Sequence, residues 1–440
     1  MTLPPPPHRP VLVAPAAGTR RAEIALVAAE EFTRRGYHST RVEHIAERLD
    51  LSPGALYRHV PGKYEMFRDA VAVLVSELEA ATTAGVGPVA GEGDALGRLV
   101  ESITLATLAH RSRAALYRWQ ARYLGPEDRA AVVAADARVR GRLAAAVRGR
   151  RRGGAAEGAG SAAGAILSCI SSLGHHRIGI ADSDAVALMT AIAGDLAASV
   201  PPPRPGPSPA APSPAGPSPA GPSQAGLSPA GSSQTGRLRS GALGGESLRG
   251  GAATREGAIA AAIARFHSSG YDSVTMEAIG ADVGVAASAL YRHFPGKSAL
   301  LTAVVDRTAV LVGDLLDRHA AWPGADAEPA EVLADLLEQY VAIAFSHGPD
   351  LMLYHSELGS LSADDRRRIR RAQHGQLDRW AGLLLEAARA RGGPRPDPDD
   401  ARIRVHAALA VVLDGGRATN FDPSVSTRLG QLARLVLLPR

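Results

Sequence analysis

Two short runs of this sequence place a phenol, an imidazole and an ammonium group at the same spacing. The run Leu56-Tyr57-Arg58-His59-Val60-Pro61-Gly62-Lys63 and the run from Leu290 to Lys297 are identical at seven of eight positions. Lys63 and Lys297 are the only two lysines of the chain, although arginine is abundant, so this position favours a compact ammonium. Each lysine follows Pro-Gly at a predicted helix start, where an ammonium and backbone N–H groups are suited to hold a phosphate.

The two runs belong to a long internal repeat. The same register pairs Phe32 with Phe266 and Glu43 with Glu277, and a fainter echo of Leu116-Tyr117 recurs at Leu353-Tyr354. The duplicated unit is therefore a half-chain of about 200 residues. Between the copies, residues 201–251 repeat Ser-Pro-Ala-Gly units, a composition typical of a disordered linker.

Composition favours helices. Apolar residues make up 45% of the chain but aromatic residues only 4%, and alanine is the commonest apolar residue, which suits helices better than sheets. A net charge of +5 over 440 residues is too weak to indicate nucleic-acid binding by itself. Cys169 is the one cysteine, which excludes an intrachain disulfide and fits a reducing cytosol.

No apolar run approaches the roughly 18 residues needed to span a bilayer, and the first residues lack the features of a signal peptide. The sequence therefore predicts a cytoplasmic protein with no membrane partner.

The elements that would position the first motif are three helices. Periodic apolar residues predict a helix over 19–35, the Thr-x-x-Glu form at Thr40 predicts a capped helix over 42–49, and Ser52-Pro53 predicts a short helix over 53–59. A capped helix, a tight turn and a short helix form the helix-turn-helix pattern. In this pattern the leading residues of the last helix approach the base edges of the major groove, here Ser52, Pro53, Gly54 and Ala55.

These motifs together resemble the amino-terminal domain of the TetR family. The resemblance rests on Gly-Tyr after the first helix, Thr-x-x-Glu-x-Ile-Ala, Leu-Ser-Pro-Gly-Ala-Leu-Tyr-Arg-His and Pro-Gly-Lys. It implies that phosphate contacts or groove-flanking positions belong to Thr40, Tyr57, His59, Lys63, Tyr291, His293 and Lys297.

The second copy departs from the first at its predicted helix caps. Val274 stands at the position of Thr40, and Ala286-Ala287 replace Ser52-Pro53, so two caps worth about 1 kcal/mol each are expected to be lost. Thr275 and Ser273 are the candidates to replace the first of them. The second reading helix would begin with Ala286, Ala287, Ser288 and Ala289, so the two half-sites in DNA need not match.

The fold class predicted from these features is all-α, with two TetR-like subunits in one chain. The expected ranges are a disordered tail, a first helix-turn-helix domain, a first helical regulatory domain, a disordered linker, a second helix-turn-helix domain and a second regulatory domain, at 1–18, 19–66, 67–200, 201–251, 252–300 and 301–440.

The resemblance also implies operator DNA and a small-molecule effector as partners, with the two halves pairing inside one chain. A linker of about fifty residues has a reach of roughly 35 to 42 Å, which favours such pairing. Association into a further homodimer stays open. An alternative keeps DNA binding in the first copy alone and makes the second half a degenerate interaction module.

Candidate effector-pocket residues are Tyr117, Trp119, Tyr123, Tyr354 and His355, although their helical spacing is equally typical of core packing. The adjacent His175-His176 point about 100° apart on a helix, so no metal or other cofactor is expected. An enzyme is the competing class, but the chain has no Glu-x-x-His pair, phosphate-binding loop or Gly-x-Ser-x-Gly elbow.

Overall fold

The computed structural model describes most of the chain. The described residues are 12–84, 94–113, 116, 123–150, 158–176, 178–199, 251–320, 328–392 and 397–438. The predicted linker therefore lies outside the described residues except for Gly251, which is already the first residue of a helix.

Every regular element in the described part of the first half is a helix. Its helices are α1 (Arg20–Arg35), α2 (Val42–Arg48), α3 (Pro53–Tyr57), α4 (Lys63–Ala84), α5 (Ala95–Ala109), α7 (Pro126–Arg150), α8 (Ala159–Ser172) and α9 (Asp182–Ala198). The helix starts predicted at 42 and 53 agree with the structure, and Thr19 is the N-cap of α1.

The second half repeats this order. Its helices are α10 (Gly251–Ser269), α11 (Met276–Val283), α12 (Ala287–Tyr291), α13 (Lys297–Ala320), α14 (Pro329–Ser346), α15 (Gly348–Ser356), η2 (Leu358–Ser360), α16 (Ala363–Ala390), α17 (Pro398–Ala418), η3 (Pro423–Val425) and α18 (Ser426–Leu437). The all-α fold with two copies of the amino-terminal three-helix unit is confirmed.

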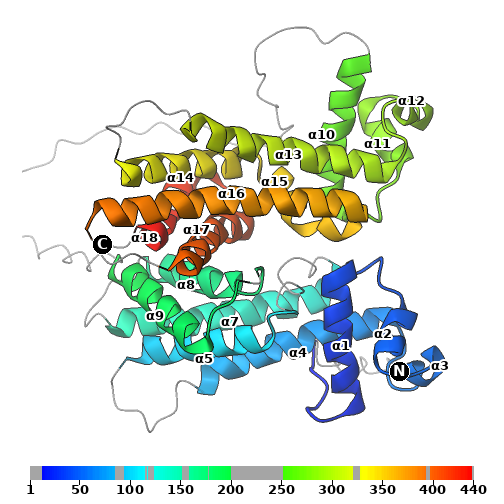
Figure 1. Ribbon diagram of the computed structural model, residues 1–440. Coiled ribbons are helices and arrows are strands. Elements are labelled where there is room, and N and C mark those ends of the chain that lie inside the picture. Colours follow the sequence, from blue (N-terminus) through cyan, green and yellow to red (C-terminus); the bar gives the residue numbers. More distant parts are fainter. Residues whose placement is uncertain are drawn as a thin grey trace, which may run out of the picture.

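The two halves lie side by side, and both three-helix units are at the same end of the molecule (Figure 1). We call α1–α3 head one and α10–α12 head two. The long helices α4 and α13 connect each head to the bundle of its own half, because each begins directly after the short third helix.

The halves share a hydrophobic core. Helix α17 packs against α8, and α18 contacts both α8 and α9. One cluster of buried residues includes Ile166 and Ile170 of α8 together with Ala408 and Val411 of α17. Small side chains allow this close approach, and the Cys169 thiol lies 3.9 Å from the Ala407 carbonyl oxygen at the same contact. Burial raises the pKa of this thiol, so it stays neutral.

Within the described ranges, no helix combines the length and apolar character required to cross a bilayer.

Candidate nucleic-acid interface

Head one is built around a small aromatic and aliphatic core. Ile24 and Phe32 of α1, Ile45 of α2 and Leu56 of α3 are all fully buried. Phe32 meets Phe67 of α4 edge-to-face, with ring centroids 5.2 Å apart. Because one buried leucine anchors the whole of α3, the other side chains of this five-residue helix are left at the surface.

The short helices of the two heads start differently. The Ser52 hydroxyl accepts a hydrogen bond from the Ala55 N–H at 3.1 Å, and Pro53 is the first residue of α3. Ala286 holds the same position before α12 in almost the same backbone conformation, but it provides no side-chain cap. The loss of this cap, predicted from the sequence, is confirmed.

The turn before each short helix needs a left-handed residue. Asp50 has φ 53° in head one, and Gly284 has φ 74° in head two. Gly280 permits a second close approach, because a Cβ there would lie 2.7 Å from the Val285 carbonyl oxygen. The first copy places the small Ala46 at the corresponding position, fully buried in the head. These residues fix the angle between the two helices of each motif.

The exposed faces of the two short helices match. Tyr57 and Tyr291 are 48% and 49% exposed, which is unusual for large aromatic side chains and is repeated at equivalent positions. The next residues, Arg58 and Arg292, are also exposed. His59 is exposed, whereas His293 is half-buried.

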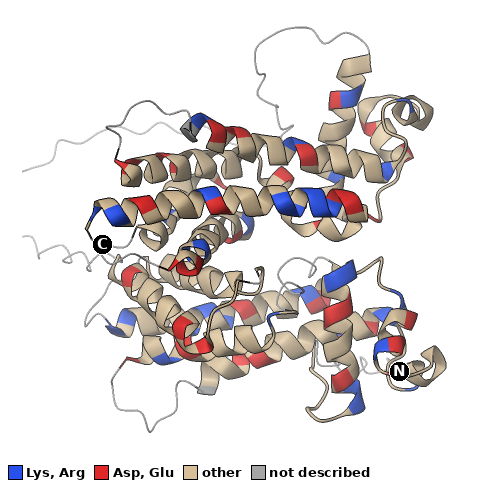
Figure 2. Cartoon of the chain, in the orientation of Figure 1, with Lys and Arg blue, Asp and Glu red and all other residues tan. Residues whose placement is uncertain are grey.

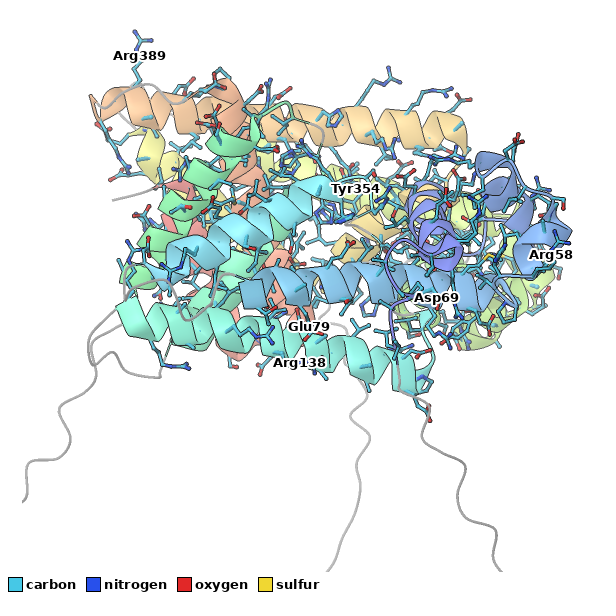
Figure 3. The ribbon with its side chains drawn as sticks, turned by 90° about the horizontal axis from the view of Figure 1, so that it is seen from below. Arg58, Asp69, Glu79, Arg138, Tyr354 and Arg389 are labelled. Carbon is cyan, nitrogen blue, oxygen red and sulfur yellow. The ribbon has the colours of Figure 1, made fainter. Side chains whose placement is uncertain are left out.

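The sequence reasoning missed the two arginines. No ion pair of Arg58 or Arg292 occurs among the described side chains, so both guanidinium groups are free to meet an external anion. Figure 3 shows Arg58 at the outer end of the molecule. The signal was present in the sequence, because both arginines lie inside the identical Leu-Tyr-Arg-His run.

The residues predicted to approach base edges lie at the surface of the heads. Ser52, Gly54, Ala286 and Ser288 are exposed, and half-buried positions belong to Pro53, Ala55, Ala287 and Ala289. Around them the charge is mixed, because acidic and basic residues both occur along α1 (Figure 2). Any attraction for phosphate must therefore come from particular side chains.

The two lysines, the first residues of α4 and α13, each contact a loop of the adjoining head. Lys63 Nζ donates to the His38 carbonyl at 3.0 Å and lies 4.8 Å from the centre of the Tyr37 ring. Lys297 Nζ donates to the carbonyls of Tyr271 and Asp272 at 2.9 and 3.0 Å. Burial lowers the pKa of both lysines, against the opposing effect of Asp272. Each ammonium thus ties the start of a long helix to the loop before the second helix.

The expected role of Thr40 needs correction. Thr40 is fully buried, and its hydroxyl is shared between the carbonyl oxygens of Glu31 and Gly36, so this hydroxyl does not cap α2 and is not exposed at the surface. The N-cap of α2 is Arg41, one residue later, whose backbone N–H donates to His44 Nδ1 at 3.1 Å.

The corresponding cap in head two is intact. Thr275 is exposed and its hydroxyl accepts from the Ala278 N–H at 3.2 Å. The expectation that the second copy loses two caps is therefore wrong, because Thr40 was never a cap and Thr275 is one.

An ion pair joins the first two helices of each head with its charges exchanged. In head one, Glu31 of α1 forms an ion pair with Arg48 of α2 at 3.2 Å. In head two, Arg265 of α10 forms an ion pair with Asp282 of α11 at 2.6 Å. Burial opposes ionisation of Glu31, but hydrogen bonds from Arg34, Arg35 and Arg48 lower the pKa of its carboxyl to about 2.

The candidate effector residues do not all lie at one site in the structure. Tyr117 and Trp119 lie outside the described residues. Tyr354 and His355 line a cavity of about 210 Å³ in the second half, and Figure 3 shows Tyr354 in the interior of the molecule. His175 and His176 contribute to the same wall. No group of three or more His, Cys, Asp or Glu in the described ranges is arranged to hold a metal ion.

Tyr123 is not at the cavity. Its ring stacks on Tyr37 of head one with centroids 5.3 Å apart, and a Cβ at Gly270 of head two would lie 3.1 Å from its Cε1. The structure places this ring between the two heads and not at the cavity that Tyr354 and His355 line.

Comparison with known proteins gives two matches to one family model. The model described as bacterial regulatory proteins, tetR family, matches residues 24–70 and 258–304, which cover the two heads and the starts of α4 and α13. No curated protein sequence matches the chain significantly.

Solved structures match about two fifths of the chain. PfmR of Thermus thermophilus is 25% identical, covers 40% of this chain and 98% of its own, and has a TM-score of 0.36. SmeT, the repressor of a Stenotrophomonas maltophilia multidrug efflux pump, is 27% identical, covers 42% of this chain and 90% of its own, and has a TM-score of 0.33.

Proposed function

Because this chain belongs to the TetR family of bacterial regulatory proteins and contains the family's amino-terminal domain twice, we propose that both heads read one imperfect palindrome from a single polypeptide. As a member of this family, the chain is a DNA-binding transcription regulator and not an enzyme. What we propose beyond family membership is how two unequal heads act together on DNA. We place this activity in the cytoplasm, where operator DNA is accessible in bacteria.

The observation that carries the proposal is the matched exposure of Tyr57-Arg58 and Tyr291-Arg292. An exposed tyrosine followed by an arginine that has no ion pair among the described side chains, repeated at the end of both short helices, is suited to contact phosphates on either side of a major groove. Ser52 to Ala55 and Ala286 to Ala289 would then face the bases. Since these leading residues differ, the two half-sites are expected to differ as well.

Pairing within the chain is supported by the shared core of α8 and α17. Paired helix-turn-helix units read half-sites about 34 to 36 Å apart, so both heads must be held on one side of the molecule. Their common location at one end of the molecule supports this arrangement (Figure 1).

A second arrangement leaves DNA contact to head one alone. The specific observation in its favour is the absent cap at Ala286, which leaves the amino terminus of α12 with one unsatisfied donor more than α3. In that arrangement Arg292 and Lys297 make no contribution to DNA affinity.

We further propose that the regulator is a repressor released by a small molecule. An effector that fits only one spacing of the heads shifts the population away from the spacing that DNA requires. The cavity lined by Tyr354 and His355 is the candidate place for such a molecule.

The test is the salt dependence of DNA affinity. A duplex selected by the wild-type protein from random sequence is titrated at several salt concentrations with wild type, Arg58→Ala, Arg292→Ala and Arg389→Ala. Loss of one phosphate contact lowers the salt slope by about 1. Arg389 is the control of equal charge, since it is exposed on α16 at the end of the molecule opposite Arg58 (Figure 3).

We expect both Arg58→Ala and Arg292→Ala to lower the slope, and Arg389→Ala to leave it unchanged. An unchanged slope for Arg292→Ala alone supports the single-head arrangement. Absence of salt-sensitive binding to every selected duplex contradicts the proposal as a whole.

A further inference from the structure

Among the residues that the structure describes, the two halves differ in the cavities that they line. In the second half, helices α13 to α17 surround the cavity of about 210 Å³. In the first half, the corresponding helices α4, α5 and α8 leave a recess of about 30 Å³ among the described residues, the volume of about one liquid-water molecule. At that position His110 Nε2 and Glu77 Oε2 lie 2.6 Å apart. Of these two spaces, the larger one has room for an organic ligand, because about 150 Å³ is already enough for one benzene ring.

The wall of the larger cavity is apolar and aromatic, with neutral hydrogen-bonding groups. Trp380, Tyr340 and Tyr354 provide ring surface, and Gln373 and Gln376 provide amide groups. Five histidines complete the lining: His175, His176, His355, His374 and His406. None of the described lining residues is a carboxylate, so a cationic ligand would find no opposite charge among them.

The first half closes this cavity with a histidine backed by a positive charge. Arg111 Nη2 lies 3.0 Å from His176 Nδ1 and donates to it, because a guanidinium has no acceptor. The proton of this buried imidazole is therefore on Nε2, which has no hydrogen-bond partner in the described part of the chain. A buried donor without an acceptor destabilises the ligand-free protein, and an oxygen atom of a ligand would remove that penalty.

We infer that each chain binds one ligand, a small apolar molecule with a carboxylate or similar anionic head, in the second-half cavity that His175 and His176 of the first half close. The inference rests on the proposed function, since it names the effector class and assigns sensing to one half. The apolar body lies against Trp380 and Tyr354, and the anionic head accepts from the imidazole and amide N–H groups.

Two contacts connect this one cavity to head one. Leu358, a lining residue, is followed by Gly359, where a Cβ would lie 3.3 Å from the Arg35 carbonyl oxygen at the end of α1. Arg113, two residues after Arg111, forms an ion pair with Glu30 of α1 at 2.7 Å. Glu30 also forms an ion pair with Arg48 of α2.

Head two is connected through its own half. The lining helix α15 packs directly against α10 and α13. A ligand in the second half is therefore in a position to bias both heads.

Three probes that share one ring but differ in their polar group test the ligand class. They are 4-ethylbenzoate, 4-ethylbenzamide and 4-ethylbenzylamine, and the last is a cation at neutral pH. Calorimetric titration of the full chain without DNA is expected to give one benzoate site per chain, with at least tenfold weaker binding of the ammonium probe. Two equivalent sites, or equal or tighter binding of the ammonium probe, or no benzoate binding, would overturn the inference.

Two variants locate the site. Ala410→Phe fills the cavity and is expected to abolish benzoate binding, whereas Ala106→Phe, its control in the first-half recess, leaves binding intact. His176→Leu keeps an apolar wall but removes the donor, so benzoate should weaken at least tenfold and benzamide less. Benzoate binding that survives both Ala410→Phe and His176→Leu, in protein with wild-type helicity, contradicts the assigned site.

A DNA titration distinguishes failure of the ligand-site inference from failure of the proposed DNA-binding function. Benzoate should weaken binding to the selected duplex. If the chain binds DNA but not benzoate, only this inference fails; if it binds benzoate but no duplex, the proposed function fails and the ligand site stands.

Discussion

At the scale of single residues, the two lysines show that groups suited to contact DNA also stabilise the fold of the heads. Lys63 and Lys297 each join a loop carbonyl to the start of a long helix, and each lies over a tyrosine ring. A compact ammonium fits this place better than a planar guanidinium, which explains lysine in a chain rich in arginine. Lys63 uses one of its three donors on the loop and Lys297 uses two, so neither contact prevents a phosphate from binding.

Glu31 leads to a prediction of acid sensitivity in head one. Its folded pKa of about 2 is below the ordinary value of 4.5, so its stabilising effect is complete above pH 4.5 and is lost as the pH falls toward 2. The full effect is at most about 3 to 4 kcal/mol, since one pKa unit corresponds to about 1.4 kcal/mol. Glu31→Gln should lower stability at pH 7 and flatten its dependence between those two pH values.

Urea unfolding of wild type and Glu31→Gln at pH 7 and at steps below pH 5 measures this effect. A parallel loss of stability in the two proteins across the acidic range would show that Glu31 does not carry it.

At the scale of elements, the two short reading helices differ mainly at their first residue. Ser52 and Ala286 have ψ values of 151° and 150°, so the backbone already has N-cap geometry in both heads, but only the serine has an oxygen to use. The turn residues also differ in type, because the left-handed position is Asp50 in head one and Gly284 in head two.

Ala286→Ser should therefore restore a cap without moving the backbone. We expect a gain of about 1 kcal/mol in head two, and an equal loss in head one from Ser52→Ala. Hydrogen exchange of the α12 and α3 amides, which reports local opening, measures both. If Ala286→Ser leaves the α12 amides as exchangeable as before, the missing cap is not what distinguishes the heads.

At the scale of the whole molecule, one core spans both halves, and Tyr123 of the first half touches Gly270 of head two. Such contacts make the halves depend on each other for burial of apolar surface. The proposed pairing then needs the linker for effective concentration during folding, and not for holding the folded halves together.

Cleavage at a protease site inserted within residues 210–240 tests this arrangement. The cut halves should elute together as a species of 45.5 kDa by light scattering. Ala408→Asp, which places a charge in the α8–α17 contact, should let them separate after cleavage. Separation of the cut wild-type halves would contradict intrachain pairing.

The sequence by itself determined the helical class, the duplication and the reading motifs. These depend on local signals, namely caps, apolar periodicity and an identical run of residues, which act within a few turns of helix. Tertiary structure decided the rest, because it brings together residues far apart in the chain. In the structure Thr40 is buried, and Tyr123 packs between the heads. His175 and His176 of the first half line the second-half cavity. No spacing in the sequence reports such contacts, since they depend on how two helical bundles pack.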